Sequence, residues 1–166
     1  MKANKVPVLG ILDEFKTTVG NLNAINTLNS LGAGYGVQLI TVIQNLGQLK
    51  ELMPHNWETY LSNSGFQIYG RCRDWTTSEY LSRMSGSVEA QTASKQFGRD
   101  VNVSVGTQAK RFLLPEETRE LGDNEALVFC DGVPGVIRAG RRPYYDPNEP
   151  HFKGRYDMDP YHAKKA

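Results

Sequence analysis

Two largely apolar runs lie near the start of the chain, at residues 6–12 and at 37–43, where the second is rich in β-branched residues. Because neither run alternates between apolar and polar residues, each predicts a strand covered on both faces, as in a parallel sheet flanked by helices. Each run is followed by apolar residues at helical spacing, at 22–31 and at 46–53 before Pro54. The order strand, helix, strand, helix predicts an α/β fold.

A third strand and a third helix are predicted after these elements. The strand covers residues 66–69, and Thr76 or Thr77 caps a helix that Gly86 ends. Residues 87–110 are polar and show no clear period, so they predict a long surface loop. The α/β unit is therefore expected to end where this loop begins.

The rest of the chain predicts a small closing unit and a tail. Residues 111–142 contain a helix with Pro115 in its first turn, then two short apolar runs joined around Asp131 and Gly132. Two such runs joined by a tight turn predict a β-hairpin. Residues 143–166 are rich in Pro, Tyr, Asp and Lys without an apolar period, which predicts an extended or disordered tail.

Composition excludes several classes of protein. The chain has 166 residues and is 39% hydrophobic, which is too apolar for intrinsic disorder. Its formal net charge of +1 gives no overall field that would mark a nucleic-acid binder. The apolar runs are far shorter than the ~20 residues of a membrane-spanning helix, and the start does not resemble a signal peptide. The sequence therefore predicts a soluble, cytoplasmic chain.

Cysteine and histidine add little chemistry. Cys72 and Cys130 each lack a close second cysteine, which excludes a disulfide framework and a cysteine zinc site. Arg71 and Arg73 flank Cys72, so this thiol is either activated by their charge or merely structural. The three histidines lack the spacing of metal ligands.

The main chemical signal is a pair of carboxylates directly after the first apolar run. Asp13 and Glu14 would lie at the carboxyl end of a parallel strand, where α/β sheets bind ligands. An aspartate there can hold Mg²⁺ against nucleotide phosphates, directly or through water, and the glutamate can polarise an attacking water. This is the Walker B arrangement. Two acids after an apolar run can also simply begin a helix, since the helix dipole favours them there.

A glutamine at the end of the second predicted strand adds to this signal. The amide of Gln44 could hydrogen-bond a terminal phosphate or orient the water, although a polar residue at a strand-to-helix turn is common. The phosphate cradle that such a site needs is missing from the chain. No glycine is followed by lysine, so no G-x-x-x-x-G-K-[S/T] loop occurs. The residues therefore predict half of a nucleotide site.

Taken together, the segments resemble the type IV coupling proteins, the TraG/TraD-type ATPases of conjugation and type IV secretion. The resemblance runs in order along nearly the whole chain. It is carried by residues 11–15, 34–39, 44–50, Asn63, Asp74, 77–82, Gly86, 111–117, Leu121 and 142–145. One position departs from the pattern, because Ala33 stands in a turn where the family often has arginine.

The resemblance implies an incomplete RecA-like P-loop NTPase fold, with its C-terminal half at residues 1–86 completed by 111–142. Matched by position, Asp13 would bind Mg²⁺ with ATP, Glu14 would activate water and Gln44 would sense the γ-phosphate. The relatives are hexamers anchored at the bacterial inner membrane, with the motor on its cytoplasmic face. The implied partners are a missing N-terminal motor half or neighbouring copies, a DNA–relaxase complex or secreted protein, and components of the secretion channel.

Four arginines are candidates for contacts with other subunits or with DNA. Arg71 and Arg73 lie at the end of the third predicted strand and could act on a neighbouring subunit. Arg141 and Arg142 belong to a basic, aromatic stretch that could contact phosphates and stack on bases. Solvated surface arginines are the alternative for both pairs.

Two functions stay open on the sequence alone. The chain is either the C-terminal part of a coupling ATPase, active only with a Walker A loop, or a non-catalytic module that docks on secretion or conjugation components. In RecA-like sheets the Walker A strand lies between the strands that end here at Gln44 and near Arg71. Without that strand apolar edges are exposed. We therefore expect the isolated chain to be poorly soluble or molten, or to pair with a separate N-terminal half.

Overall fold

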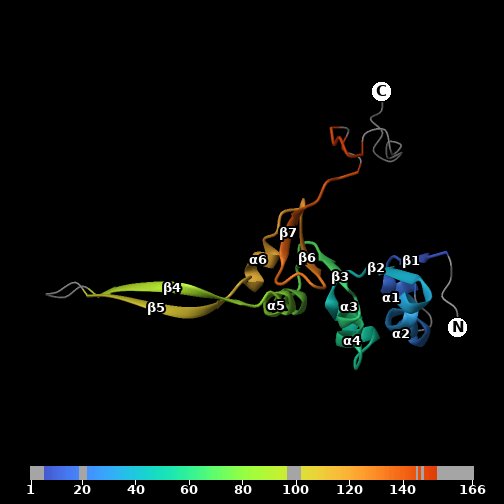
Figure 1. The fold of residues 1–166 in the computed structure, drawn as a ribbon, viewed down its shortest axis with the longest axis horizontal. Helices are drawn as coiled ribbons and strands as arrows, with labels where there is room; N and C mark the ends of the chain where they lie inside the picture. The colour runs from blue at the N-terminus through green and yellow to red at the C-terminus, as the bar shows by residue number, and fades with distance from the viewer. Residues whose placement is uncertain (1–5, 19–21, 97–101, 145, 147, 153–166) are drawn as a thin grey trace.

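The computed structural model describes residues 6–18, 22–96, 102–144, 146 and 148–152. A body of helices and short strands carries a long two-stranded ribbon on one side, and the C-terminal segment leaves the body in another direction (Figure 1). In chain order the elements are β1 (Val8–Leu12), α1 (Phe15–Thr18), α2 (Leu22–Leu31), the 3₁₀ helix η1 (Gly32–Tyr35), β2 (Val37–Thr41), α3 (Leu46–Leu52), α4 (Trp57–Ser62), β3 (Phe66–Tyr69), α5 (Trp75–Met84), β4 (Ser87–Gln96), β5 (Asn102–Arg111), α6 (Pro115–Arg119), β6 (Glu125–Cys130) and β7 (Ile137–Gly140).

The two apolar runs form a parallel pair, as predicted. β1 pairs with β2 in a register that runs from Val8 opposite Val37 to Leu12 opposite Thr41. Gly36 turns the chain into β2 with a left-handed φ of 75°, which glycine adopts without a steric penalty. The pairing continues past the strands, because the Val42 N–H donates to the Leu12 carbonyl at 2.9 Å. Both strands therefore end at the same edge.

A separate antiparallel sheet holds the other short strands. Its order is β3-β6-β7, and among the described strands β3 is not hydrogen-bonded to β1 or β2. The predicted hairpin is confirmed, with Val128 opposite Ile137 next to its turn. Gly132 and Gly135 take left-handed φ values of 79° and 82° in this turn. β2 and β3 thus each lie at an edge of their own small sheet.

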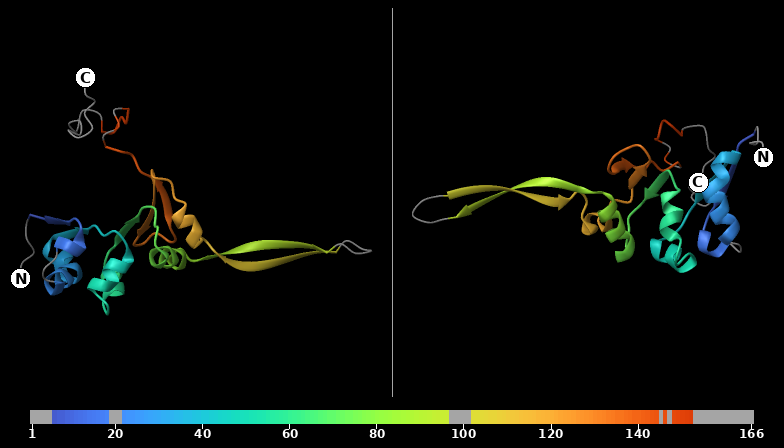
Figure 2. Two further views of the ribbon diagram at one scale, coloured as in Figure 1. Left: turned by 180° about the vertical axis from the view of Figure 1, so that it is seen from behind. Right: turned by 60° about the horizontal axis from the view of Figure 1, so that its bottom comes forward.

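The predicted polar loop at 87–110 is wrong. β4 and β5 form an antiparallel ribbon that pairs Ser87 with Arg111 at its root and Gln96 with Asn102 at its far end. The ribbon projects from the body in every view (Figure 2). Residues 106–110 are exposed. Neither face of such a ribbon packs against a core, so its strands need no alternation of apolar and polar residues. The hydrophobic pattern of the sequence therefore did not reveal it.

Two buried clusters hold the body together. The first contains Phe15, Leu46, Leu49, Met53, Tyr60 and Leu61, and the second contains Cys72, Leu81, Leu121, Leu127 and Phe129. Tyr80 of α5 packs against both clusters. The first cluster takes its residues from α1, α3, α4 and the start of the α3–α4 loop, and the second from α5, β6 and neighbouring loops. Helix packing, rather than a continuous sheet, therefore joins the two halves of the body.

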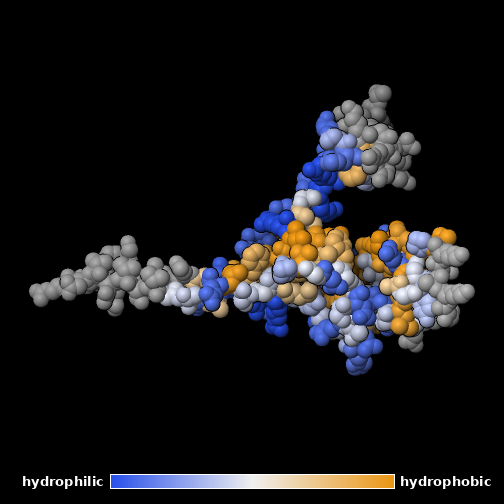
Figure 3. Space-filling view, in the orientation of Figure 1, coloured by the Kyte–Doolittle hydropathy of each residue, from blue (hydrophilic) through white to orange (hydrophobic). Residues whose placement is uncertain are grey.

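The strands themselves are unusually exposed. Leu9 and Ile11 of β1 are 55% and 63% exposed, and Phe66 and Ile68 of β3 are 59% and 62% exposed. Figure 3 shows apolar residues gathered on the surface of the body, over the antiparallel sheet and near β1 and β2. The cover that the sequence predicts for these strands is thus incomplete within the described residues. No helix in this part of the chain is long and apolar enough to cross a membrane.

Candidate functional site

The two acids lie where β1 gives way to α1. Asp13 and Glu14 are exposed, while Phe15, which follows them, is fully buried in the first cluster. The Phe15 N–H donates to the Val42 carbonyl at 3.0 Å, which ties this turn to the end of β2. Glu14 has a left-handed φ of 49°, and its N–H donates to Asp13 Oδ1 at 2.9 Å. The turn therefore holds both carboxylates at the strand end.

The glutamine lies in the corresponding turn after β2. Gln44 is exposed and its Oε1 accepts from the Gln48 side-chain amide at 3.0 Å. Asn45 caps α3, since its Oδ1 accepts from the Gln48 N–H at 2.9 Å. The next residue, Leu46, is 1% exposed and belongs to the same cluster as Phe15. Each of the two turns is thus followed by a buried anchor.

The geometry brings the three predicted site residues to one end of the β1–β2 pair. Carboxylate oxygens are the ligands that Mg²⁺ prefers, and Mg²⁺ is usually held by one or two carboxylates together with phosphates and water. Asp13 and Glu14 fit that role in number and chemistry. In the described part of the chain, no cluster of three or more His, Cys, Asp or Glu could hold a metal ion alone. The arrangement suits a Mg²⁺ ion whose remaining ligands are phosphate oxygens and water.

The four candidate arginines have different surroundings. Arg71 donates from Nε to the Leu121 carbonyl, and its guanidinium lies 3.1 Å from Asp123. Arg142 pairs with Glu149 at 2.9 Å. All four residues are exposed. Two of the four side chains are therefore engaged within the chain, which sequence reasoning did not reveal because their partners are distant in sequence or lie in the predicted tail.

Cys72 is a structural thiol. Burial in the second cluster, together with the nearby Asp74 carboxylate, raises its pKa to about 11. Its Sγ donates to the Gly70 carbonyl at 3.3 Å. The flanking Arg71 and Arg73 therefore do not activate it, and the alternative of a reactive cysteine is wrong.

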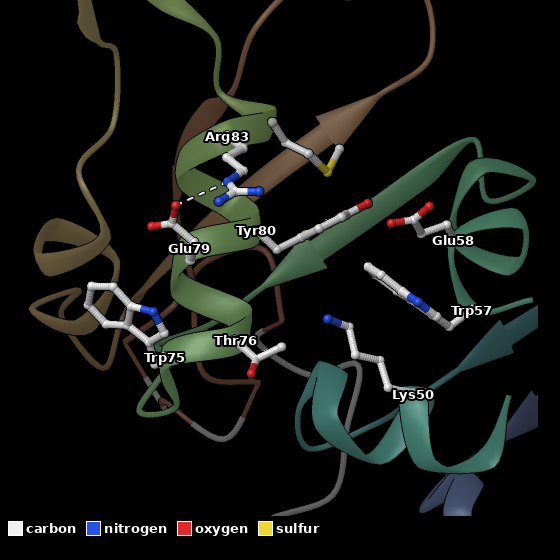
Figure 4. A pocket seen from close by; sticks show the side chains of 9 residues that line it. Lys50, Trp57, Glu58, Trp75, Thr76, Glu79, Tyr80 and Arg83 are labelled. Atoms are coloured by element: carbon white, nitrogen blue, oxygen red, sulfur yellow. Dashed lines mark hydrogen bonds and ion pairs between the residues drawn. The ribbon is translucent and has the colours of Figure 1, made fainter. Parts of the chain in front are cut away.

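Sequence reasoning missed a groove between α3–α4 and α5. It encloses about 500 Å³ and contains Lys50, Trp57, Tyr80 and Trp75 among its lining residues (Figure 4). Lys50 Nζ lies 4.3 Å from the centroid of the Trp57 ring, and the Trp57 and Tyr80 rings meet edge to face at 5.6 Å. The groove was hidden because α4 was not predicted. It contains none of the three predicted nucleotide-site residues.

The fold is α/β and RecA-like, and it is shared with part of two solved coupling proteins. The solved coupling protein TrwBdeltaN70, in its unbound monoclinic form, superposes with a TM-score of 0.67 at 17% identity, covering 86% of this chain and 33% of that chain. The plasmid coupling protein TrwB in complex with ADP and Mg²⁺ gives a TM-score of 0.64 at 18% identity, covering 83% of this chain and 31% of that chain. These likenesses confirm the predicted α/β class.

The family follows from sequence comparison. The model of the family described as type IV secretory system conjugative DNA transfer matches residues 1–164. Protein VirD4 of Agrobacterium fabrum is 31% identical over 150 residues, which is 87% of this chain and 22% of VirD4. The conjugal transfer protein TraG of the same organism is 25% identical over 140 residues, covering 80% of this chain and 21% of TraG. The chain belongs to this family of type IV coupling proteins, and it spans about a fifth of the length of these relatives.

Proposed function

We propose that this chain is the C-terminal part of the ATPase core of a conjugative coupling protein. In the complete site Asp13 binds Mg²⁺ with ATP, Glu14 activates water and Gln44 contacts the γ-phosphate. The observation that supports this most directly is the placement of two carboxylates and one amide at one end of a parallel strand pair, each turn fixed by a buried neighbour. TrwB, a structural neighbour, binds ADP with Mg²⁺.

The chemistry of the residues is consistent with phosphoryl transfer to water. Bound Mg²⁺ would neutralise charge on the phosphate oxygens. The Glu14 carboxylate accepts a proton from the attacking water, or orients that water by a hydrogen bond. The Gln44 carboxamide carries both a donor and an acceptor, so it can contact a phosphate oxygen and the water together.

The two separate sheets support a missing strand between β2 and β3. Each of these strands lies at an edge of its own sheet, and the edges carry unpaired backbone groups among the described residues. A parallel strand that leads into a G-x-x-x-x-G-K-[S/T] loop would use both edges and bring the phosphate cradle next to Asp13. We call this chain, together with a polypeptide segment carrying that loop, the assembled motor.

The proposed partners follow from the family. The assembled motor would form a homo-hexamer at the cytoplasmic face of the inner membrane and pass a DNA–relaxase complex or a protein to the secretion channel. Arg71, Arg73, Arg141 and Arg142 remain candidates for contacts with neighbouring subunits or DNA. Arg73 and Arg141 are the better candidates because Arg71 and Arg142, although also exposed, already have partners within the chain.

Steady-state ATP hydrolysis by the assembled motor tests this function. Glu14→Gln keeps the shape of the side chain and removes its basicity, so kcat should fall at least about 100-fold while ATP still binds. Glu51→Gln on α3 is the matched control, because Glu51 pairs with Lys16 on the surface and should leave kcat within about twofold.

Unchanged turnover in Glu14→Gln would exclude the proposed role of Glu14. The alternative function, a non-catalytic module that docks on secretion components, predicts instead that the assembled motor hydrolyses no ATP even with Glu14 intact. Binding of channel components by the same preparation gives a second test. A docking module should bind them equally well with and without ATP.

A further inference from the structure

A buried hydroxyl of α5 is hydrogen-bonded to the turn that carries Gln44. The Leu46 N–H donates to Thr77 Oγ1 at 3.1 Å, across 31 residues of sequence. Leu46 and Thr77 are 1% and 3% exposed. This bond therefore lies in the interior, where water does not compete with it and where losing it leaves an unpaired amide.

The direction of the hydroxyl is fixed by a carboxylate. Thr77 Oγ1 donates to Asp74 Oδ1 at 2.9 Å, and the same oxygen accepts from the Thr77 N–H at 2.8 Å as the cap of α5. Because a carboxylate only accepts, the single hydroxyl proton points at Asp74. The lone pairs of the hydroxyl are therefore left for the Leu46 N–H.

The turn after β2 is thus fixed by hydrogen bonds within the turn and by one hydrogen bond to α5. Leu46 is the first residue of α3, and Asn45 and Gln48 close the cap within the turn. Gln48 in turn donates to Gln44 Oε1, which directs the Gln44 NH₂ group to the other side. The hydrogen bond from the Leu46 N–H to Thr77 Oγ1 connects this small network to α5.

We propose that Thr77, oriented by Asp74, is a positioning residue for Gln44 in ATP hydrolysis. This inference rests on the proposed function. The hydroxyl fixes the position and orientation of the turn after β2. The Gln44 amide can then reach the terminal phosphate at the end of the β1–β2 pair. Through this bond, α5 and the antiparallel sheet contribute to a site whose other residues all lie on the first half of the body.

A double-mutant cycle in the assembled motor tests the proposal, with saturating Mg-ATP as substrate. Thr77→Val replaces the hydroxyl by a methyl group of similar shape, and we expect kcat to fall about tenfold with KM within about twofold. Thr77→Ser should restore kcat to within about twofold of the parent. Gln44→Ala should lower kcat at least as much, and Thr77→Val should add less than about twofold to it. Thr76→Val, one position earlier on α5, is the matched control.

A second measurement does not depend on activity. Hydrogen exchange of the peptide that contains Leu46 should be faster in Thr77→Val and unchanged in Thr77→Ser and Thr76→Val. If Thr77→Val does not fold, Asp74→Asn replaces it, since asparagine keeps the helix cap while its neutral amide oxygen holds the hydroxyl less firmly than the carboxylate does. We then expect about a threefold loss of kcat that is again absent in the Gln44→Ala background.

The outcomes separate this inference from the proposed function. If Gln44→Ala lowers kcat and Thr77→Val leaves it unchanged, or if the two effects multiply, the positioning role is overturned while the proposed function stands. If Glu14→Gln and Gln44→Ala both leave kcat unchanged, the proposed function fails and the positioning role fails with it.

Discussion

The backbone at Glu14 is strained, and the strain lies at the proposed catalytic residue. Among the described residues, Glu14 is the only one besides glycines with a left-handed φ. Such a conformation costs about 1–3 kcal/mol and persists only where the surroundings fix it. Here the hydrogen bond to Asp13 and the burial of Phe15 fix it. The sequence indicated the two acids, but no residue type at this position demands a positive φ, so the turn could not be predicted.

Cys72 gives a prediction at the same scale. With a pKa of about 11, the thiol should resist alkylation by iodoacetamide at pH 8 and react faster as the pH rises towards 11. Burial favours the neutral thiol in the folded state, so the stability it contributes is present below the ordinary pKa and is lost as pH rises through the folded value. Mass spectrometry of the Cys72 peptide from the assembled motor measures the rate of alkylation, with the urea-unfolded protein as control. Equal rates at pH 8 in the folded and unfolded states would contradict it.

At the scale of elements, the ribbon depends on its root. Arg111 donates to Glu79 Oε1 at 3.1 Å and to Ser82 Oγ at 3.2 Å, so the end of β5 is attached to α5. The Leu113 N–H adds a bond to Ser85 Oγ at 3.1 Å. A two-stranded ribbon alone is at best marginally stable in water. These contacts with α5 therefore decide how well the ribbon is ordered where it meets the body.

Removing the acid at this root should loosen the ribbon. In Glu79→Gln we expect amides of β4 and β5 to exchange several-fold faster in the assembled motor, with the rest of α5 little changed. The hydrogen bond from Arg111 is the main cause that holds the Glu79 pKa below its ordinary value. The attachment is therefore present above the ordinary pKa and is lost as pH falls through the lower folded value. Glu89→Gln on β4 is the control, and equal exchange in both variants would contradict the prediction.

Elements with a strong pattern were predicted, and elements without one were not. The parallel pair, α2, α3, α5 and the C-terminal hairpin all carry apolar spacing or turn residues that match their structure. α4 was missed because it is only six residues long and follows directly on Pro54 and its neighbours. The link from Thr77 to Leu46 could not be predicted either. A contact between residues 31 positions apart depends on how α3 and α5 pack.

At the scale of the molecule, two half-covered sheets share one body. β2 and β3 each have a free edge among the described strands, and strand residues such as Ile11 and Ile68 are largely exposed. Exposed apolar strands with unpaired edges promote association with other chains. The sequence predicted the free edges, but it predicted covered faces for these strands, and their faces are largely exposed.

The behaviour of the isolated chain tests this description. Alone, we expect it to sediment as oligomers or aggregates and to melt over a broad range without a cooperative transition. Co-expression with a segment that carries the phosphate loop should give a soluble complex with a cooperative transition, because the added strand pairs with both edges. A co-expressed segment in which that strand carries two prolines is the control. Monomeric sedimentation of the chain alone with cooperative melting would count against a missing strand.

Because the ribbon is long, its far end would move much further than α5 itself if α5 tilted. Thr77 lies in the first turn of this helix, and the ribbon is attached near its last turn. β4 has 10 residues, and strands rise about 3.4 Å per residue, so its far end lies roughly 34 Å from the pivot. A tilt of about 5° would displace that end by about 3 Å, the length of one hydrogen bond. A rotation of α5 too small to break the packing of the body would thus move the far end of the ribbon far enough to change its contacts with a neighbouring molecule.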